Sequence, residues 1–260
     1  MKNLSKIIFP IVMGCVLVFA SCKKDDSSSS RTFEDVERDF NALDLSPGIH
    51  DITLAMLDGD SYKFRVIAPV RAAGEKRPFV LNLHGASGGN QEAYKATACL
   101  VEPGLAGLNA FIISPYGDNG LWYESYYNQE VITLVNLAKK YWPIDLNKTV
   151  VTGYSNGGNG SWFFAETQPA MFTASIPMAS SYDITNPNGL GRKINIPMYV
   201  IHGQNDELFP VAQTQTWVQL SQVAGSNITF VVAPGLSHYI PCSYVSYLQG
   251  AANWLVNTVW

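Results

Sequence analysis

Residues 150–160 read VVTGYSNGGNG, in which a short apolar run leads into a G-x-S-x-G pentapeptide and then into two further glycines. The apolar run is typical of a buried strand, and a helix is expected after the pentapeptide. A serine on so tight a turn has a strained backbone, and its neighbours two residues away must be nearly free of side chains, as Gly153 and Gly157 are. The stretch therefore predicts a nucleophilic Ser155 at the end of a strand.

A serine hydroxyl is a poor nucleophile near neutral pH unless a histidine accepts its proton and an acid orients that histidine. The chain has four histidines. His50 precedes the first expected strand, and His84 and His202 each stand at a strand end in a His-Gly pair. His238, in the stretch GLSH after the last expected strand, is therefore the predicted base by elimination and by position.

The predicted acid is Asp206, in the loop IHGQNDELFP that follows an expected strand upstream of His238. Glu207 competes with it for this role. An H-G-x-x-D-x-x-x-P pattern fits Asp206, whereas Glu207 stands one residue out of register. Asp206 would also suit a turn or a helix cap.

Two backbone N–H groups should face the oxygen anion that forms when a serine attacks a carbonyl, and losing one such donor costs about 10²–10³ in rate. The N–H of Asn156, directly after the serine, is one predicted donor. The other is expected in the loop LHGASGG (residues 83–89), whose glycines let the backbone turn beneath the site, and we assign it to Ala86. His84 is then a structural residue of that loop.

Outward from this motif, short apolar runs alternate with helical patterns, which predicts an α/β fold with a mostly parallel, twisted sheet and helices on both faces. Ahead of them, residues 51–57 and 61–66 alternate apolar and polar side chains around a turn, which predicts an antiparallel hairpin. The expected buried strands are 79–83, 110–114, 150–152, 174–177, 198–202 and 229–232, and the clearest helices are 126–141, 212–224 and 244–259.

The 260 residues are 47% hydrophobic and 15% charged, with a formal net charge of −4. This composition is that of a folded chain, and it offers no basic surface for nucleic acid. No CxxC or HExxH pattern is present, and no metal is predicted. The sequence leaves open whether Cys99 and Cys242 form a disulfide.

Residues 1–21 combine two lysines with a short apolar run and resemble a lipoprotein signal peptide that ends before Cys22. An ordinary cleaved signal with a stray cysteine is the alternative. A flexible tether is expected over 22–35, because KKDDSSSS cannot bury a core. The prediction is an outer-membrane lipoprotein of bacteria, anchored by lipid on Cys22, with a single domain over 36–260. The lysines and acids after Cys22 favour the cell surface, and a periplasmic face is the alternative.

The segments LHGASGG, GYSNGG, HGQNDELFP and GLSH together resemble the α/β-hydrolase superfamily, in which the serine, the acid and the histidine follow in this chain order. Within it they are similar to an esterase branch that includes phospholipase/carboxylesterases, feruloyl and acetyl-xylan esterases and polyhydroxybutyrate depolymerases. The resemblance covers about residue 60 to the C-terminus. It implies a serine carboxylic-ester hydrolase that works through an acyl-enzyme and needs no cofactor.

Many relatives carry a helical lid ahead of the strand that leads to the acid, but residues 178–196 show no helical period, and no large lid is expected. An open cleft suits polymer-linked esters, such as acetyl or feruloyl groups on polysaccharides, or a polyester. Aromatic side chains are expected to line this cleft, although the same side chains would equally serve to cap the core. They are Tyr116, Trp122, Tyr123, Phe209 and Tyr239.

Two other functions are weighed beside the esterase. A serine exopeptidase uses the same three side chains, but such enzymes usually carry a large propeller or cap domain, for which the chain has no room. A non-catalytic surface binding protein on the same fold would need neither the serine nor its partners. The sequence leaves open the oligomeric state, the acyl group and the alcohol.

Overall fold

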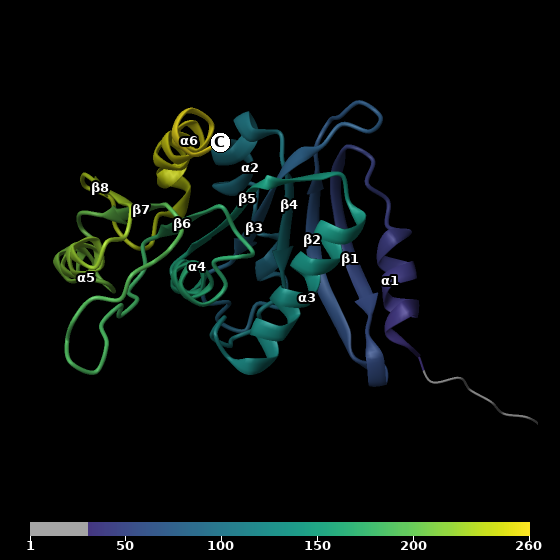
Figure 1. The fold of residues 1–260 in the computed structure, drawn as a ribbon, viewed down its shortest axis with the longest axis horizontal. Helices are drawn as coiled ribbons and strands as arrows, with labels where there is room; N and C mark the ends of the chain where they lie inside the picture. Colours follow the sequence, from purple (N-terminus) through teal and green to yellow (C-terminus); the bar gives the residue numbers. More distant parts are fainter. Residues whose placement is uncertain (1–30) are drawn as a thin grey trace, which may run out of the picture. The chain divides into compact units, whose positions relative to one another are not determined.

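The expected strands pair as one eight-stranded sheet in the computed structural model, which describes residues 31–260 (Figure 1). In chain order they are β1 (Gly48–Ala55), β2 (Ser61–Ala68), β3 (Arg77–Leu83), β4 (Phe111–Pro115), β5 (Ile144–Tyr154), β6 (Ala174–Met178), β7 (Met198–Gly203) and β8 (Ile228–Ala233). They lie in the order β1-β2-β4-β3-β5-β6-β7-β8. β2 runs antiparallel to β1 and β4, and the other neighbouring pairs of the described sheet are parallel. The predicted hairpin and mostly parallel sheet are confirmed.

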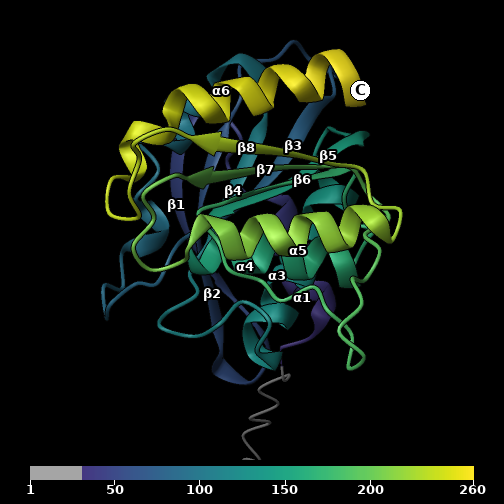
Figure 2. The same ribbon diagram turned by 90° about the vertical axis from the view of Figure 1, so that its left-hand side faces the viewer.

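Helices cover both faces of this sheet. They are α1 (Phe33–Asn41), α2 (Val101–Leu105), α3 (Ser125–Tyr141), α4 (Asn156–Thr167), α5 (Val211–Val223) and α6 (Val245–Trp254), which a π-helical turn (Leu255–Val259) extends. Figure 2 shows α6 above the strands and α3, α4 and α5 below them. Because side chains alternate along a strand, Phe79 and Leu81 pack into the core beside α3 and α4, whereas Val80 packs with α2 and α6.

No lid covers the sheet between β6 and β7. This connecting segment contains one isolated bridge, between Thr185 and Gly191, and no helix. The prediction of an α/β fold without a large lid is confirmed over the described residues.

The folded part of the chain starts earlier than the predicted boundary at residue 36. Helix α1 begins at Phe33, inside the predicted tether 22–35, and a capping box stabilises its first turn. Val36 and Phe40, one helical turn apart, are fully buried in the core. The helix was not predicted because it lies next to the polar stretch KKDDSSSS, which was interpreted as part of one tether up to residue 35.

Residues 31–260 form one compact unit. The predicted signal peptide over residues 1–21, the lipid site Cys22 and the first part of the tether lie outside the described residues. No helix in the described range is long and apolar enough to cross a membrane.

A disulfide joins Cys99, just before α2, to Cys242, in the turn before α6, with the two Cα atoms 5.0 Å apart. The bond answers the question that the sequence left open. It ties together α2 and α6, which pack on the same face of the sheet, and it connects positions separated by 143 residues.

We expect the Cys99→Ser/Cys242→Ser variant to lose about 2–5 kcal/mol of the free energy of unfolding, because a cross-link over so long a loop strongly restricts the unfolded chain. Urea titrations of both proteins measure the loss. Dithiothreitol should destabilise the wild-type protein and leave the variant unaffected. Equal urea midpoints for the two proteins would show that the bond contributes nothing in solution.

A carboxyl group is buried on α3 without a full set of partners. Glu130 is 2% exposed, and no described group forms a hydrogen bond with its Oε1. Burial, and to a smaller extent the charge of Asp60, raise the pKa of Glu130 to about 9. The carboxyl is therefore protonated and neutral at pH 7.

We expect Glu130→Gln to raise the free energy of unfolding by about 1–3 kcal/mol at pH 8 and by much less at pH 5. The folded carboxyl keeps its proton up to a pKa of about 9, whereas an unfolded glutamate loses it above its ordinary pKa of 4.5. Wild-type stability should therefore fall as the pH rises between these values, and glutamine should remove this dependence. Urea unfolding at both pH values measures it, with the exposed Glu34→Gln as control. An unchanged pH dependence in Glu130→Gln would contradict the prediction.

Candidate active site

Ser155 stands on the sharp turn between β5 and α4, with backbone angles of φ 57° and ψ −119°. Residues other than glycine rarely adopt a backbone conformation with such a positive φ, which costs on the order of 1–3 kcal/mol. The Ser155 N–H donates to the carbonyl of Met178 at the end of β6, 3.0 Å away, which holds the turn against the neighbouring strand. The strained serine turn that the pentapeptide predicts is present.

The positions around this serine require glycine, because a side chain there would clash with neighbouring backbone. A Cβ on Gly157 would lie 1.8 Å from the Leu83 carbonyl oxygen, and one on Gly153 would lie 2.4 Å from the Gly157 backbone. A Cβ on Gly85 would lie 3.3 Å from the Tyr154 carbonyl oxygen. The end of β3 and the loop after it therefore pack directly against the serine turn.

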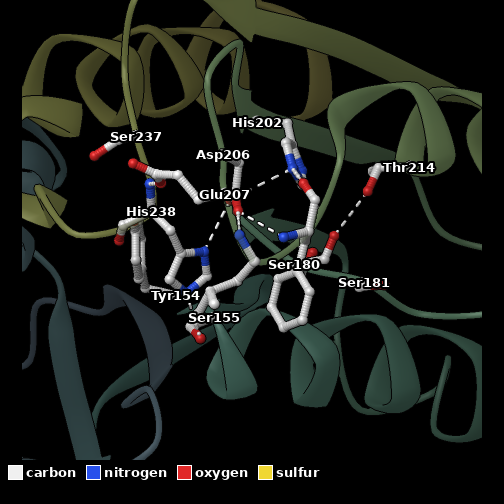
Figure 3. Close-up of polar contacts among 12 residues, drawn as sticks. Tyr154, Ser155, Ser180, Ser181, His202, Asp206, Glu207, Thr214, Ser237 and His238 are labelled. Carbon is white, nitrogen blue, oxygen red and sulfur yellow. Dashed lines mark hydrogen bonds and ion pairs between the residues drawn. The ribbon is translucent and has the colours of Figure 1, made fainter.

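The three side chains predicted for catalysis form one hydrogen-bonded series (Figure 3). His238 Nε2 lies 2.9 Å from Ser155 Oγ, and His238 Nδ1 lies 2.8 Å from Asp206 Oδ2. The Asp206 side chain is fully buried, and that of His238 is 6% exposed. Because Nδ1 keeps its proton and donates it in a hydrogen bond to the carboxylate, Nε2 is left unprotonated and can accept the serine proton. The arrangement has the geometry that a nucleophile, a base and an orienting acid need.

Asp206 rather than Glu207 faces the histidine ring. Asp206 Oδ1 accepts the N–H groups of Leu208 and Phe209 at 3.0 and 2.7 Å, which holds the carboxylate in place. Glu207 Oε2 instead accepts the backbone N–H of His238 at 2.9 Å. Of the two competing acids, Asp206 therefore contacts the His238 ring, whereas Glu207 contacts the His238 backbone.

Three further side chains support this arrangement, and the sequence motifs predict this role for none of them. His202 Nε2 donates to the Phe209 carbonyl at 2.8 Å, and burial lowers the His202 pKa, so a neutral imidazole braces the acid loop. The Tyr154 hydroxyl donates to the carbonyl of His238 at 2.9 Å, and that of Tyr244 donates to the carbonyl of Ser237 at 3.1 Å. The His-Gly pair at a strand end is the one sequence signal that pointed to any of these residues.

His84 links two loops beside the site. Its Nδ1 donates to the Gly85 carbonyl at 2.6 Å, while its Nε2 accepts the Gly117 N–H at 3.0 Å. Burial lowers the His84 pKa, so the ring is neutral in this position. Both ring nitrogens are thus engaged with backbone, which agrees with the structural role predicted for His84.

Asn156 and Ala86 carry the two N–H groups expected to face an oxyanion. Asn156 is the first residue of α4, so its N–H has no acceptor within the helix and lies at the positive end of the helix dipole. Ala86 belongs to the loop that packs against the serine turn, and no group in the described chain accepts its N–H. Ala86 lines the same cavity as Ser155. Both N–H groups remain the predicted oxyanion donors.

Ser155 opens onto a cavity of about 520 Å³ on the α2 and α6 side of the sheet. Residues 90–100, which follow the loop LHGASGG and include the disulfide-bonded Cys99, supply one wall, and no sequence motif points to these residues. No aspartate, glutamate, lysine or arginine among residues 31–260 lines the cavity. Its apolar lining includes Ala86, Ala93, Ala96, Leu100, Val101, Met178, Leu208 and Pro241.

Two of the five aromatic residues predicted for the cleft lie beside His238. Tyr239 lines the cavity and is 66% exposed. Phe209 lies edge-on to the His238 ring, with centroids 5.1 Å apart, although it does not line the cavity.

The other three aromatic residues do not line the cavity of Ser155. The prediction of Trp122 as a cleft residue is wrong. Trp122 is 1% exposed and its indole N–H donates to the His84 carbonyl at 3.0 Å, so it supports the loop from below. Tyr116 is wrong as well, because its ring packs edge-on against Tyr94 outside the cavity lining. Tyr123 is 43% exposed and lines a second, separate cavity.

Comparisons with known proteins agree with this fold. The model of the dienelactone hydrolase family matches residues 126–252, a little under half of the chain, and this range contains Ser155, Asp206 and His238. Among solved structures, a thermostable esterase is similar with a TM-score of 0.66 and 21% identity, over 80% of this chain and 62% of that chain. The chain therefore spans less than two thirds of that esterase.

Two further structures are covered almost completely. A fluorophosphonate-binding serine hydrolase from Staphylococcus aureus gives a TM-score of 0.65 and 15% identity, over 82% of this chain and 100% of that one. Esterase 2 of Thermogutta terrifontis, phosphorylated by paraoxon, gives a TM-score of 0.62 and 16% identity, over 81% of this chain and 94% of that one. No curated protein matches the chain.

The serine turn and the sheet order give the chain the fold of these esterases and serine hydrolases. Residues 126–252 are similar to the dienelactone hydrolase family, which is consistent with the resemblance of the motifs to α/β-hydrolases. Within residues 31–260, no cluster of His, Cys, Asp or Glu side chains is arranged to hold a metal ion.

Proposed function

We propose that the protein is a carboxylic-ester hydrolase that forms an acyl-enzyme on Ser155. The observation that carries this proposal is the hydrogen-bonded series Ser155–His238–Asp206 at the edge of an uncharged cavity. The same series would serve amide cleavage, but no charged side chain of the described cavity is placed to hold a peptide amine.

In the first half-reaction, Ser155 Oγ attacks the ester carbonyl carbon while His238 Nε2 takes the hydroxyl proton. The carbonyl oxygen becomes an anion that the Asn156 and Ala86 N–H groups stabilise. When the tetrahedral intermediate collapses, the bond to the alcohol breaks and His238 returns the proton to the departing oxygen. Asp206 stabilises the imidazolium that exists between these two transfers.

In the second half-reaction, water attacks the acyl carbon and gives a proton to His238. The bond to Ser155 Oγ breaks, the proton passes back to that oxygen, and the carboxylic acid leaves. Atoms and charges balance without a cofactor.

The acyl group that fits this site is neutral. A carboxylate inside the cavity of Ser155 would lose its hydration without gaining a cation, which is costly. The absence of a lid between β6 and β7 leaves the cleft open to esters attached to a polymer. We therefore propose acetyl or feruloyl groups on a polysaccharide, or a polyester, as the substrate class.

The first test is a substrate panel of p-nitrophenyl acetate, butyrate and octanoate with methyl ferulate, set beside matched p-nitroanilides. Hydrolysis of the esters and not of the anilides is the expected result. Faster cleavage of the anilides would establish a peptidase. If the protein hydrolyses none of these substrates and a fluorophosphonate does not label it, the remaining hypothesis is a non-catalytic binding protein.

We also propose that the chain is a lipoprotein anchored through Cys22 at the cell surface, on the basis of its N-terminal sequence. The lipid anchor would be supported if the protein incorporates a radioactive fatty acid and the Cys22→Ser variant does not. Exposure at the cell surface would be supported if protease added to intact cells digests the protein. If the wild-type protein incorporates no fatty acid, residues 1–21 are an ordinary cleaved signal peptide and Cys22 is not lipidated.

A further inference from the structure

A second cavity, of about 390 Å³, lies close to Ser155 and is not used by the reaction described above. It shares no lining residue with the cavity of Ser155. Its lining consists of three aromatic and three polar side chains, namely Tyr123, Phe163, Tyr182, Asn159, Ser181 and Asp183.

The second cavity begins one helical turn from the nucleophile. The Asn159 N–H donates to the Ser155 carbonyl at 3.0 Å in the first turn of α4, so the two residues are about 6 Å apart along the helix. Asn159 Oδ1 accepts the Ser181 N–H at 2.8 Å, which joins α4 to the segment after β6. One lining residue of the second cavity therefore lies next to the turn that carries Ser155.

The two cavities adjoin the cores on opposite faces of the sheet. The first adjoins the core beside α2 and α6, through Leu100 and Val101. The second adjoins the core beside α3 and α4, through Phe163 and Tyr182. The acyl group and the alcohol of an ester extend in opposite directions from its carbonyl carbon. An acyl group in the first cavity therefore directs the alcohol toward the second.

The aromatic side chains of the second cavity offer ring surfaces that are held in place. Tyr123 is 43% exposed and lies 5.9 Å from Phe163, centroid to centroid. Tyr182 stacks on the buried Trp162 at 6.2 Å with an interplanar angle of 8°, and its hydroxyl donates to Glu166. Such surfaces match the C–H faces of a ring that is otherwise polar.

Polar groups beside these rings have hydrogen-bonding capacity to spare. Asn159 Nδ2 and the Ser181 hydroxyl form no hydrogen bond with any described residue, although both residues line the cavity. The Asp183 carboxylate is engaged through Oδ1 alone, by Thr185. One donor, one hydroxyl and one carboxylate oxygen are thus available for hydroxyl groups of a ligand.

The charge of the second cavity excludes an anionic ligand. Asp183 is its one charged lining residue within the described chain, and no lysine or arginine lines it. The nearby Arg192 is already paired with Glu166. A neutral sugar matches this lining, because it has C–H faces, several hydroxyl groups and no negative charge.

We propose that the second cavity binds a sugar unit of a neutral oligosaccharide, on the alcohol side of the ester that Ser155 cleaves. This rests on the proposed function, because it assigns a place to the alcohol of that substrate. Tyr123 stacks on the sugar ring, and Asn159 and Ser181 form hydrogen bonds with its hydroxyl groups.

The test compares acetylated xylotetraose with p-nitrophenyl acetate, which carries the same acyl group and no sugar. For Tyr123→Ala, we expect the ratio of kcat/KM for the sugar ester to that for the p-nitrophenyl ester to fall about tenfold, through a higher KM. The matched control is Tyr126→Ala, which removes another exposed tyrosine of the same segment outside the cavity. Because the ratio does not depend on the fraction of folded enzyme, partial unfolding does not affect it.

A second measurement does not require activity. Ester-free xylotetraose should bind to the full-length Ser155→Ala protein in a calorimetric titration, and adding Tyr123→Ala should weaken that binding about tenfold. An unchanged ratio, or no binding to Ser155→Ala, would overturn the sugar site while leaving the esterase standing. Absence of hydrolysis of both esters by the wild-type protein would overturn the esterase, and the titration would then still decide the sugar site.

Discussion

Ser155→Ala should lower kcat for p-nitrophenyl acetate by about 10⁴–10⁶, which leaves only the residual catalysis that the oxyanion donors and substrate binding supply. The loss is this large because no other described hydroxyl group forms a hydrogen bond with His238 Nε2, 2.9 Å from Ser155 Oγ. Circular dichroism should show no loss of structure. The alanine lacks only a hydroxyl, although its backbone must keep the left-handed conformation.

The matched control is Ser246→Ala, which removes an exposed serine hydroxyl on α6. This variant should keep the wild-type rate. A fluorophosphonate should label the wild-type protein and the Ser246→Ala control covalently, and it should not label Ser155→Ala. Full activity or full labelling of Ser155→Ala would show that the nucleophile is another residue.

Asp206→Asn is expected to lower kcat by about 10³–10⁴, because an amide in this position no longer stabilises the imidazolium or fixes the proton on Nδ1. The fold should survive, since the asparagine oxygen can still accept the N–H groups of Leu208 and Phe209. The pH dependence of kcat/KM for the wild-type protein and the variant, measured on p-nitrophenyl acetate, tests this.

Glu207→Gln separates the two acids. The amide of the substituted side chain would keep an oxygen able to accept the His238 N–H, so we expect the rate of this variant to stay within about tenfold of wild type. A loss in Glu207→Gln that equals or exceeds the loss in Asp206→Asn would reverse the assignment of the acid.

Local patterns in the sequence were enough to find the serine, its partners and most of the sheet. Ser155 follows from the glycines at 153 and 157, since only residues without side chains fit beside the Leu83 carbonyl. The strands follow from short apolar runs, because a strand buried on both faces must be apolar throughout. His238 followed from elimination among four histidines and from its place after the last strand.

The choice among chemically similar side chains depended on direction, which sequence patterns specify poorly. Asp206 and Glu207 are neighbours in the chain, yet one carboxylate reaches the His238 ring and the other its backbone. Trp122 and Tyr123 are neighbours as well, and one is buried in the core while the other lines the second cavity.

By itself, the sequence determined the α/β class, the serine turn and the chain order of the three catalytic candidates, because each depends on contacts between residues near in sequence or on the spacing of apolar positions. The tertiary structure alone decided the burial of Val36 and Phe40, the bond between Cys99 and Cys242, and the residues that line the two cavities. These features arise where segments far apart in the chain meet, and their geometry is set by the packing of helices on both faces of the sheet.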